Sequence, residues 1–147
     1  MAIDRTAHVT WEGDLRSGSG EFDLTSSNAI SGEAVTFASR FEPESGGRTS
    51  PEELIAAAHA TCFSMALANG LAQDGHAPTK LETDAQVTLD NSGGGFAISK
   101  IQLTVRGAVE GMDEAEFRKA AEQAKQNCPV SKALASVPEI ALDASLA

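Results

Sequence analysis

Hydrophobic and polar positions divide this chain into alternating segments and two longer helical ones. Alternation bounded by Gly, Ser and Asn is typical of strands, and the first third holds three such stretches, 7–11, 20–24 and 34–41. Stretches 80–90 and 96–109 flank the turn sequence Asn-Ser-Gly-Gly-Gly at 91–95, which predicts a hairpin. A last alternating stretch, 139–146, predicts a strand near the C-terminus.

The apolar phase slips within the second strand of the predicted hairpin. Phe96 and Ile98 are even-numbered, whereas Ile101 and Val105 are odd-numbered. Because successive side chains of a strand point to opposite faces, these residues can share a face only if one residue is extra. The slip therefore predicts a bulge near Ser99–Lys100.

The first long helix has a well-marked start. Ser50 is a good N-cap, and Glu53 completes a capping box with it. The helix is expected to continue to about Gly70 or Gln73. Its residues Leu54–Ala68 are apolar on nearly every face, which predicts a helix buried on most sides.

A second long helix and a short one follow the hairpin. Asp113 and Glu116 form a capping-box pair that opens a helix running to about Gln126. Cys128 stands at an N-cap position before Pro129, which suits the first residue of a short helix. The element order predicts an α+β fold with antiparallel sheets, in a single domain spanning residues 1–147. A central helix so apolar needs more cover than one small sheet supplies, which predicts an intertwined homodimer around it.

Charge and composition exclude some classes of partner. The 21 acidic and 11 basic residues give a net charge of −10. Such a field repels phosphate backbones, so a nucleic-acid partner is not expected. The N-terminal segment has no apolar core of a secretory signal, and the longest apolar run looks too short and too rich in Ala to span a bilayer. We therefore expect a cytoplasmic protein with no membrane partner.

The two cysteines of the chain are its strongest candidates for chemistry. Cys62 lies in the apolar helix, where burial raises a thiol pKa, so a reactive Cys62 needs a positive partner. His59, one turn earlier, is the local candidate for a base, although a packed histidine with one hydrogen bond is the more usual outcome. Cys128 differs, because the N–H groups at a helix start stabilise a thiolate and lower its pKa. An inert buried cysteine beside an unrelated one remains the alternative.

Two charged residues near the apolar helix complete the candidate set. Arg40 is predicted to end the strand 34–41, and its permanent charge could hold a thiolate and polarise a peroxide. Glu52 has no capping role and could orient an arginine, although favourable placement in the first helical turn explains it equally well. A metal or other cofactor is not expected, since His8, His59 and His76 are scattered and the cysteines lack CxxC spacing.

Several motifs resemble the osmotically inducible protein C family of thiol peroxidases. The sequences WEGD, SRFE, PEELIAAAHATCFSMAL, GFAISKI and CPVSKAL follow one another in the order of that family. The organic hydroperoxide resistance branch shares the two cysteines but differs in its N-terminal segment. The resemblance implies an α+β homodimer with two active sites at the subunit interface.

The same resemblance implies a mechanism and its residues. Cys62 would be peroxidatic and Cys128 resolving, with a disulfide between them, while Arg40 and Glu52 would be the thiolate-binding arginine and its partner glutamate. The expected substrate is an organic hydroperoxide, with hydrogen peroxide left open, in defence against oxidative or osmotic stress. An external dithiol, for which the family suggests a lipoylated protein, would be the reductant. A redox sensor that does not turn over and a module that binds a small hydrophobic ligand remain the alternatives.

Overall fold

A computed structural model describes residues 1–91 and 93–147 of the chain. It contains two compact units, residues 1–51 and residues 52–147, and each is described by itself. The predicted hairpin loop 91–95 includes residue 92, which lies outside the described residues. The single domain over residues 1–147 stays a prediction.

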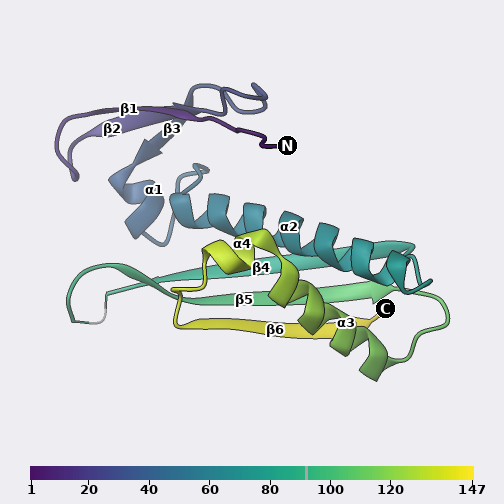
Figure 1. Cartoon of the computed structure of the whole chain (residues 1–147). Coiled ribbons are helices and arrows are strands. Elements are labelled where there is room, and N and C mark those ends of the chain that lie inside the picture. Colours follow the sequence, from purple (N-terminus) through teal and green to yellow (C-terminus); the bar gives the residue numbers. More distant parts are fainter. Residues whose placement is uncertain (92) are drawn as a thin grey trace. The chain divides into compact units, whose positions relative to one another are not determined.

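The first unit is a small antiparallel sheet followed by one helical turn (Figure 1). The sheet has the strand order β1-β2-β3, and its strands are β1 (His8–Glu12), β2 (Ser19–Asp23) and β3 (Glu33–Thr36). The predicted strand 34–41 was wrong beyond Thr36, because helix α1 (Phe37–Phe41) begins there. Thr36 and Ser39 form a capping box, in which each side chain accepts a hydrogen bond from the other's backbone N–H. These bonds satisfy backbone donors at the helix start and so end the strand.

The second unit is built on the predicted hairpin of β4 (Lys80–Asp90) and β5 (Ala97–Ala108). The two strands pair antiparallel, and their register shifts between Thr88 and Leu89. Thr88 pairs with Lys100 and Leu89 pairs with Ile98, so Ser99 is the extra residue on β5. The bulge predicted from the slip in apolar phase is therefore confirmed.

The third strand of this sheet runs in a direction that the sequence did not predict. β6 (Glu139–Leu146) pairs with β5 in parallel, so the sheet is mixed and not purely antiparallel. The connection from β5 to β6 contains two helices, α3 (Glu114–Asn127) and α4 (Pro129–Ala133). A crossover of this length returns the chain to the starting end of the sheet, as a parallel pairing requires.

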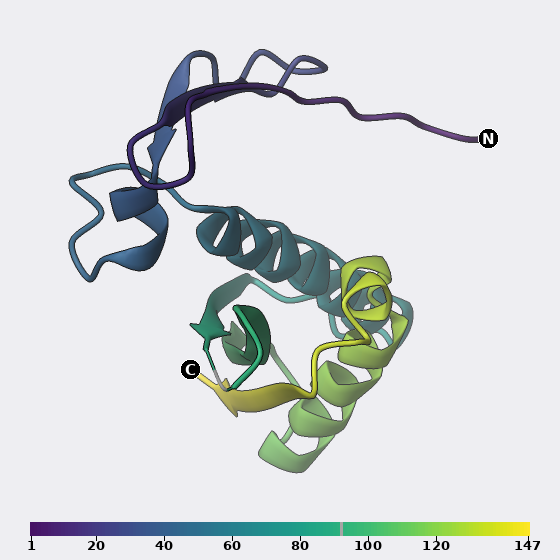
Figure 2. The ribbon, with the colours of Figure 1, turned by 90° about the vertical axis from the view of Figure 1, so that its left-hand side faces the viewer.

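Helix α2 (Pro51–Gln73) and α3 cover one face of the mixed sheet (Figures 1 and 2). One side of α2 is buried. The buried residues on this side are spaced four apart and are His59, Phe63, Leu67 and Leu71. They share one face of the helix. The hydrophobic core joins side chains of α2, the sheet and α3: Phe63, Leu67, Leu71, Leu103, Val105, Phe117, Ala121, Ala124, Cys128 and Ala144.

The opposite face of α2 is largely apolar, and the described residues of the second unit leave it uncovered. Met65 is 69% exposed, and Ala57, Ala58 and Thr61 are also exposed. The sequence predicted burial on most sides, whereas the described residues of the second unit bury one side of this helix. A second copy of the chain on this face stays a prediction.

Length and composition alone would let α2 cross a membrane, contrary to the expectation from its apolar run. The helix has 23 residues, and its most apolar window has a mean hydropathy of 1.4. A helix that belongs to a protein core passes the same test, so this criterion is weak evidence. Phe63, Leu67 and Leu71 of α2 belong to the hydrophobic core, as residues of such a helix do.

Candidate functional site

The two cysteines meet inside the second unit. Cys62 comes from the middle of α2, and Cys128 lies between α3 and α4. Both are free thiols, and each lies close enough to the other to shift its pKa. Cys62 is partly exposed and packs against the core, whereas Cys128 is fully buried within it. The fold therefore places two reduced thiols side by side, with only one of them partly open to solvent.

Cys128 has the capping role that the sequence predicted. It ends α3, where its N–H donates to the carbonyl of Ala124 at 2.8 Å, and it is the N-cap of α4. Its Sγ accepts a hydrogen bond from the backbone N–H of Ser131 at 3.5 Å, and Pro129 occupies the first position of α4. Thiolates at such a position are stabilised by backbone donors that lack a partner within the helix.

The two thiols differ in acidity for identifiable reasons. Burial raises the pKa of Cys62, and its neighbour Cys128 raises that pKa further, although the backbone N–H of Val130 opposes them. Burial acts in the same direction on Cys128, but the Ser131 backbone N–H and the Cys62 side chain outweigh it and leave the pKa of Cys128 below its usual value. A bond in which the Cys62 S–H donates to the Cys128 sulfur favours the Cys128 thiolate. Both directions agree with the sequence-based predictions.

His59 is a core residue with a specific partner. It is fully buried, and its Nε2 lies 2.7 Å from the hydroxyl Oγ of Ser131. Burial lowers the pKa of His59, so the neutral ring is favoured at neutral pH. Its other nitrogen, Nδ1, is buried without a hydrogen-bond partner among the described residues. The hypothesis of a packed histidine with one hydrogen bond is thus confirmed, and the partner is Ser131.

The two charged candidates lie in different parts of the chain. Arg40 belongs to the first unit and lies on helix α1, not at the end of a strand as the sequence predicted. Its guanidinium carbon lies 5.1 Å from the centroid of the Phe41 ring. Cys62 belongs to the second unit, so the association of Arg40 with the Cys62 thiolate stays a prediction.

Glu52 is buried in the first turn of α2. Helix α2 runs without a break from Pro51 to Gln73, and ten residues separate Glu52 from Cys62. At 1.5 Å per residue this corresponds to roughly 15 Å along the helix axis. The helix therefore does not bring the carboxylate to the Cys62 sulfur, and a role for Glu52 must act through another group.

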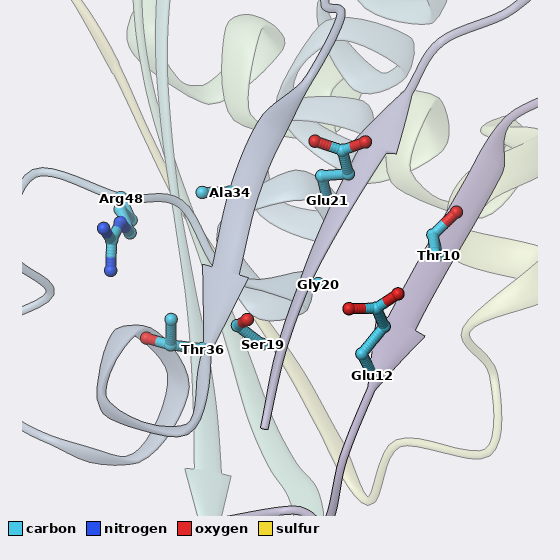
Figure 3. A pocket seen from close by; sticks show the side chains of 8 residues that line it. All are labelled: Thr10, Glu12, Ser19, Gly20, Glu21, Ala34, Thr36 and Arg48. Atoms are coloured by element: carbon cyan, nitrogen blue, oxygen red, sulfur yellow. The ribbon is translucent and has the colours of Figure 1, made fainter. Parts of the chain in front are cut away.

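A separate cavity of about 450 Å³ lies on the sheet of the first unit (Figure 3). Its lining is polar and mixed in charge, with Glu12 and Glu21 from the strands and Arg48 from the segment before α2. The remaining lining residues are Thr10, Ser19, Gly20, Ala34 and Thr36. None of the four residues predicted to carry the chemistry, which are Cys62, Cys128, Arg40 and Glu52, lines this cavity.

The sequence did not identify Ser131 as part of the site. Its hydroxyl bonds to His59 and its backbone N–H bonds to Cys128, so it touches both α2 and the start of α4. A local signal existed for the second contact, because Ser131 is the third residue after an N-cap, where a backbone N–H meets the cap side chain. The first contact joins residues 72 apart, which local patterns do not predict.

Comparisons with known proteins agree with this arrangement. A family model described as OsmC-like protein matches residues 44–143. The chain is 44% identical to peroxiredoxin OsmC of Escherichia coli (strain K12) over 146 residues, or 99% of each chain. It is 30% identical to organic hydroperoxide resistance protein OhrB of Bacillus subtilis (strain 168) over 141 residues, covering 95% of this chain and 89% of that protein.

The fold is also similar to solved structures. The crystal structure of OhrB of Bacillus subtilis matches with a TM-score of 0.68 at 26% identity, covering 97% of this chain and 98% of that one. A protein from Legionella pneumophila, described as organic hydroperoxide resistance protein OsmC, matches with a TM-score of 0.72 over 99% of both chains. On the family match and the full-length identity, this chain belongs to the OsmC family.

Proposed function

We propose that this chain is a thiol-dependent peroxidase that reduces organic hydroperoxides through Cys62 and Cys128. One observation carries the proposal: two reduced thiols from distant segments lie in the same hydrophobic core, close enough that each shifts the pKa of the other. Relatives named peroxiredoxin and organic hydroperoxide resistance protein support the same chemistry. No prosthetic group is required, because sulfur itself carries the change in oxidation state.

Exposure supports the proposed roles of the two thiols. A peroxide must reach the sulfur that attacks it, and Cys62 is the partly exposed thiol while Cys128 is 0% exposed. This difference in exposure supports a peroxidatic role for Cys62 and a resolving role for Cys128. Cys128 needs no access to substrate, because it reacts only with the oxidised neighbour.

The reaction has three steps. The Cys62 thiolate attacks one oxygen of ROOH, the O–O bond breaks, and the leaving alkoxide takes up a proton to give the alcohol, so Cys62 becomes a sulfenic acid. The Cys128 thiolate then attacks the Cys62 sulfur, an S–S bond forms, and hydroxide leaves to be protonated to water. An external dithiol finally reduces the disulfide by thiol–disulfide exchange and becomes oxidised itself.

The first step needs a cation near Cys62, because burial raises the pKa of this thiol. Arg40 is the proposed cation, since a guanidinium stays charged and can hold both a thiolate and a peroxide oxygen. Glu52 is proposed to orient Arg40, which agrees with its distance from Cys62 along α2. The uncovered apolar face of α2 supports a homodimer.

Other parts of the proposal rest on the family alone. A lipoylated protein is the suggested reductant, and defence against oxidative or osmotic stress is the suggested role. Hydrogen peroxide is a second candidate substrate.

Peroxide consumption over time in the presence of dithiothreitol tests the proposal. Wild-type protein should consume many equivalents of cumene hydroperoxide, Cys62→Ser none, and Cys128→Ser one equivalent before it stalls. Met65→Leu is the matched control, because Met65 is an exposed sulfur on the same helix that peroxide could oxidise directly. Its activity should equal that of the wild type.

The same experiment separates the alternatives. Consumption of a single equivalent by the wild type would favour a redox sensor, and no consumption would favour a module that binds a small hydrophobic ligand. Normal turnover by Cys62→Ser would overturn the assignment of the peroxidatic residue.

A further inference from the structure

A buried polar pair links the two segments that carry the cysteines. His59 is 0% exposed and Ser131 is 8% exposed, and their side chains meet at 2.7 Å. Nδ1 of the same ring has no hydrogen-bond partner among the described residues, which makes a histidine costly at this position. An apolar side chain of similar size would avoid that cost. The hydrogen bond from Nε2 to Ser131 is therefore the interaction that an apolar side chain could not replace.

The positions of the pair match those of the thiols. His59 precedes Cys62 by three residues on α2, and Ser131 follows Cys128 by three residues at the start of α4. Ser131 also donates its backbone N–H to the Cys128 sulfur. Ser131 thus contacts both helix α2, which carries Cys62, and the sulfur atom of Cys128.

Helix α4 has few buried side chains of its own to hold it in place. It has five residues, all of them described, and Ser131 is the one that is buried. Pro129, Lys132 and Ala133 are exposed, and Val130 is half-buried. An element with so little buried surface gains little from hydrophobic packing. The hydrogen bond between His59 and Ser131 then acts together with the core packing of Cys128 and Val130 at the start of this helix.

We propose that His59 is a positioning residue of the resolving step, which holds the start of α4 against α2 so that the Cys128 sulfur stays beside Cys62. The inference rests on the proposed function, because it concerns how fast the Cys62 sulfenic acid is converted to the disulfide. His59 does not touch the reacting atoms in this proposal; it acts through Ser131.

The chemistry explains why position matters. The Cys128 sulfur must approach the Cys62 sulfur closely, on the side opposite the departing hydroxide, for the S–S bond to form as the S–O bond breaks. Disulfides tolerate only a narrow range of geometries, and small displacements of reacting atoms slow such steps strongly. If α4 were displaced, the Cys62 sulfenic acid would persist for longer, and excess peroxide would oxidise it further to the sulfinic acid.

A single-turnover experiment on the full chain tests this inference. Protein without reductant receives one equivalent of cumene hydroperoxide, and samples are quenched with dimedone and an alkylating reagent for mass spectrometry. We expect Ser131→Ala and His59→Leu to consume peroxide within about twofold of the wild-type rate, but to form the disulfide roughly three- to tenfold more slowly, as for the loss of one hydrogen bond. His59→Gln should restore much of the rate, because its amide can bond to the Ser131 hydroxyl.

Ser64→Ala is the matched control. Its hydroxyl also makes a 2.7 Å bond between α2 and another element, to Thr83 on β4, but this bond does not involve α4. The control should form the disulfide at the wild-type rate. If His59→Leu does not fold, Ser131→Ala decides the question, because it removes only a hydroxyl.

The outcomes separate this inference from the proposed function. Wild-type protein whose Cys62 is not oxidised at all would overturn the proposed function and the inference together. Oxidation of Cys62 with wild-type disulfide rates in Ser131→Ala would overturn the inference alone. So would a His59→Gln variant as slow as His59→Leu, or a Ser64→Ala variant as slow as Ser131→Ala.

Discussion

Cys62 and Cys128 lie close enough to shift the pKa values of each other, and the two shifts have opposite directions. Cys128 raises the pKa of Cys62, whereas the Cys62 side chain lowers the pKa of Cys128. Within their own unit, the buried thiol is therefore the more acidic one, although the partly exposed thiol is the one that a peroxide can reach. A positive group outside this pair is therefore needed to lower the pKa of Cys62, the thiol that peroxide can reach.

Removal of either thiol should move the pKa of the other in a predictable direction. Cys128→Ala should lower the pKa of Cys62, because the neighbour that raises it is gone. Cys62→Ala should raise the pKa of Cys128, which loses a hydrogen bond to its thiolate. The pH dependence of iodoacetamide alkylation, followed by mass spectrometry, measures both. Shifts of the same sign in the two variants would contradict a bond between the thiols.

Arg40→Ala should make Cys62 less reactive. If Arg40 holds the thiolate, its loss raises the pKa of Cys62, and alkylation of Cys62 at neutral pH should slow roughly tenfold. Arg16→Ala is the matched control, since Arg16 is also exposed, lies in the same unit and stacks on an aromatic ring, with its guanidinium carbon 5.0 Å from the Phe37 centroid. Equal alkylation rates in the two variants would remove Arg40 from the mechanism.

Local patterns were enough to predict many of the elements. Strands 80–90 and 139–146, the bulge at Ser99 and the Asp113 capping box all depend on neighbouring residues, and the structure confirms each. Helix α1 also had a local signal, the spacing of Thr36 and Ser39, but the alternating Ala-Val-Thr-Phe pattern suggested that the strand continued. The parallel direction of β6 had no local signal, because a crossover and not a residue pattern sets it.

The site was predictable to a similar extent. The opposite acidities of Cys62 and Cys128 follow from an apolar helix and a helix cap, both visible in the sequence. The contact between the thiols and the bond from His59 to Ser131 join distant segments, so they depend on the packing of α2 against α4. The roles of Arg40 and Glu52 came from family resemblance and stay predictions.

The stability of the protein should fall in mildly acidic solution because of His59. Burial lowers its pKa, so the unfolded chain binds a proton below about pH 6.5 that the folded chain does not bind. Stability is therefore fully present above that pH and is lost progressively as the pH falls below it. Urea unfolding between pH 7.5 and about pH 5 should show a steeper loss for the wild type than for His59→Gln, which cannot titrate there. If the free energy of unfolding changed with pH equally in the wild type and in His59→Gln, His59 would not be the cause of the loss of stability.

Gly107 on β5 is expected to tolerate no side chain. A Cβ at this position would lie 2.5 Å from Cζ of Phe117, the fully buried aromatic ring of α3. Gly107→Ala should therefore force α3 away from the sheet and lower the free energy of unfolding by about 1–3 kcal/mol. Gly70 in α2 is the matched control, because a Cβ there meets no atom of the described residues within 4 Å. Gly70→Ala should raise the free energy of unfolding by about 0.5–1 kcal/mol, and urea denaturation distinguishes the two signs. Equal destabilisation by both variants would show that contact with Phe117 is not what requires glycine at position 107.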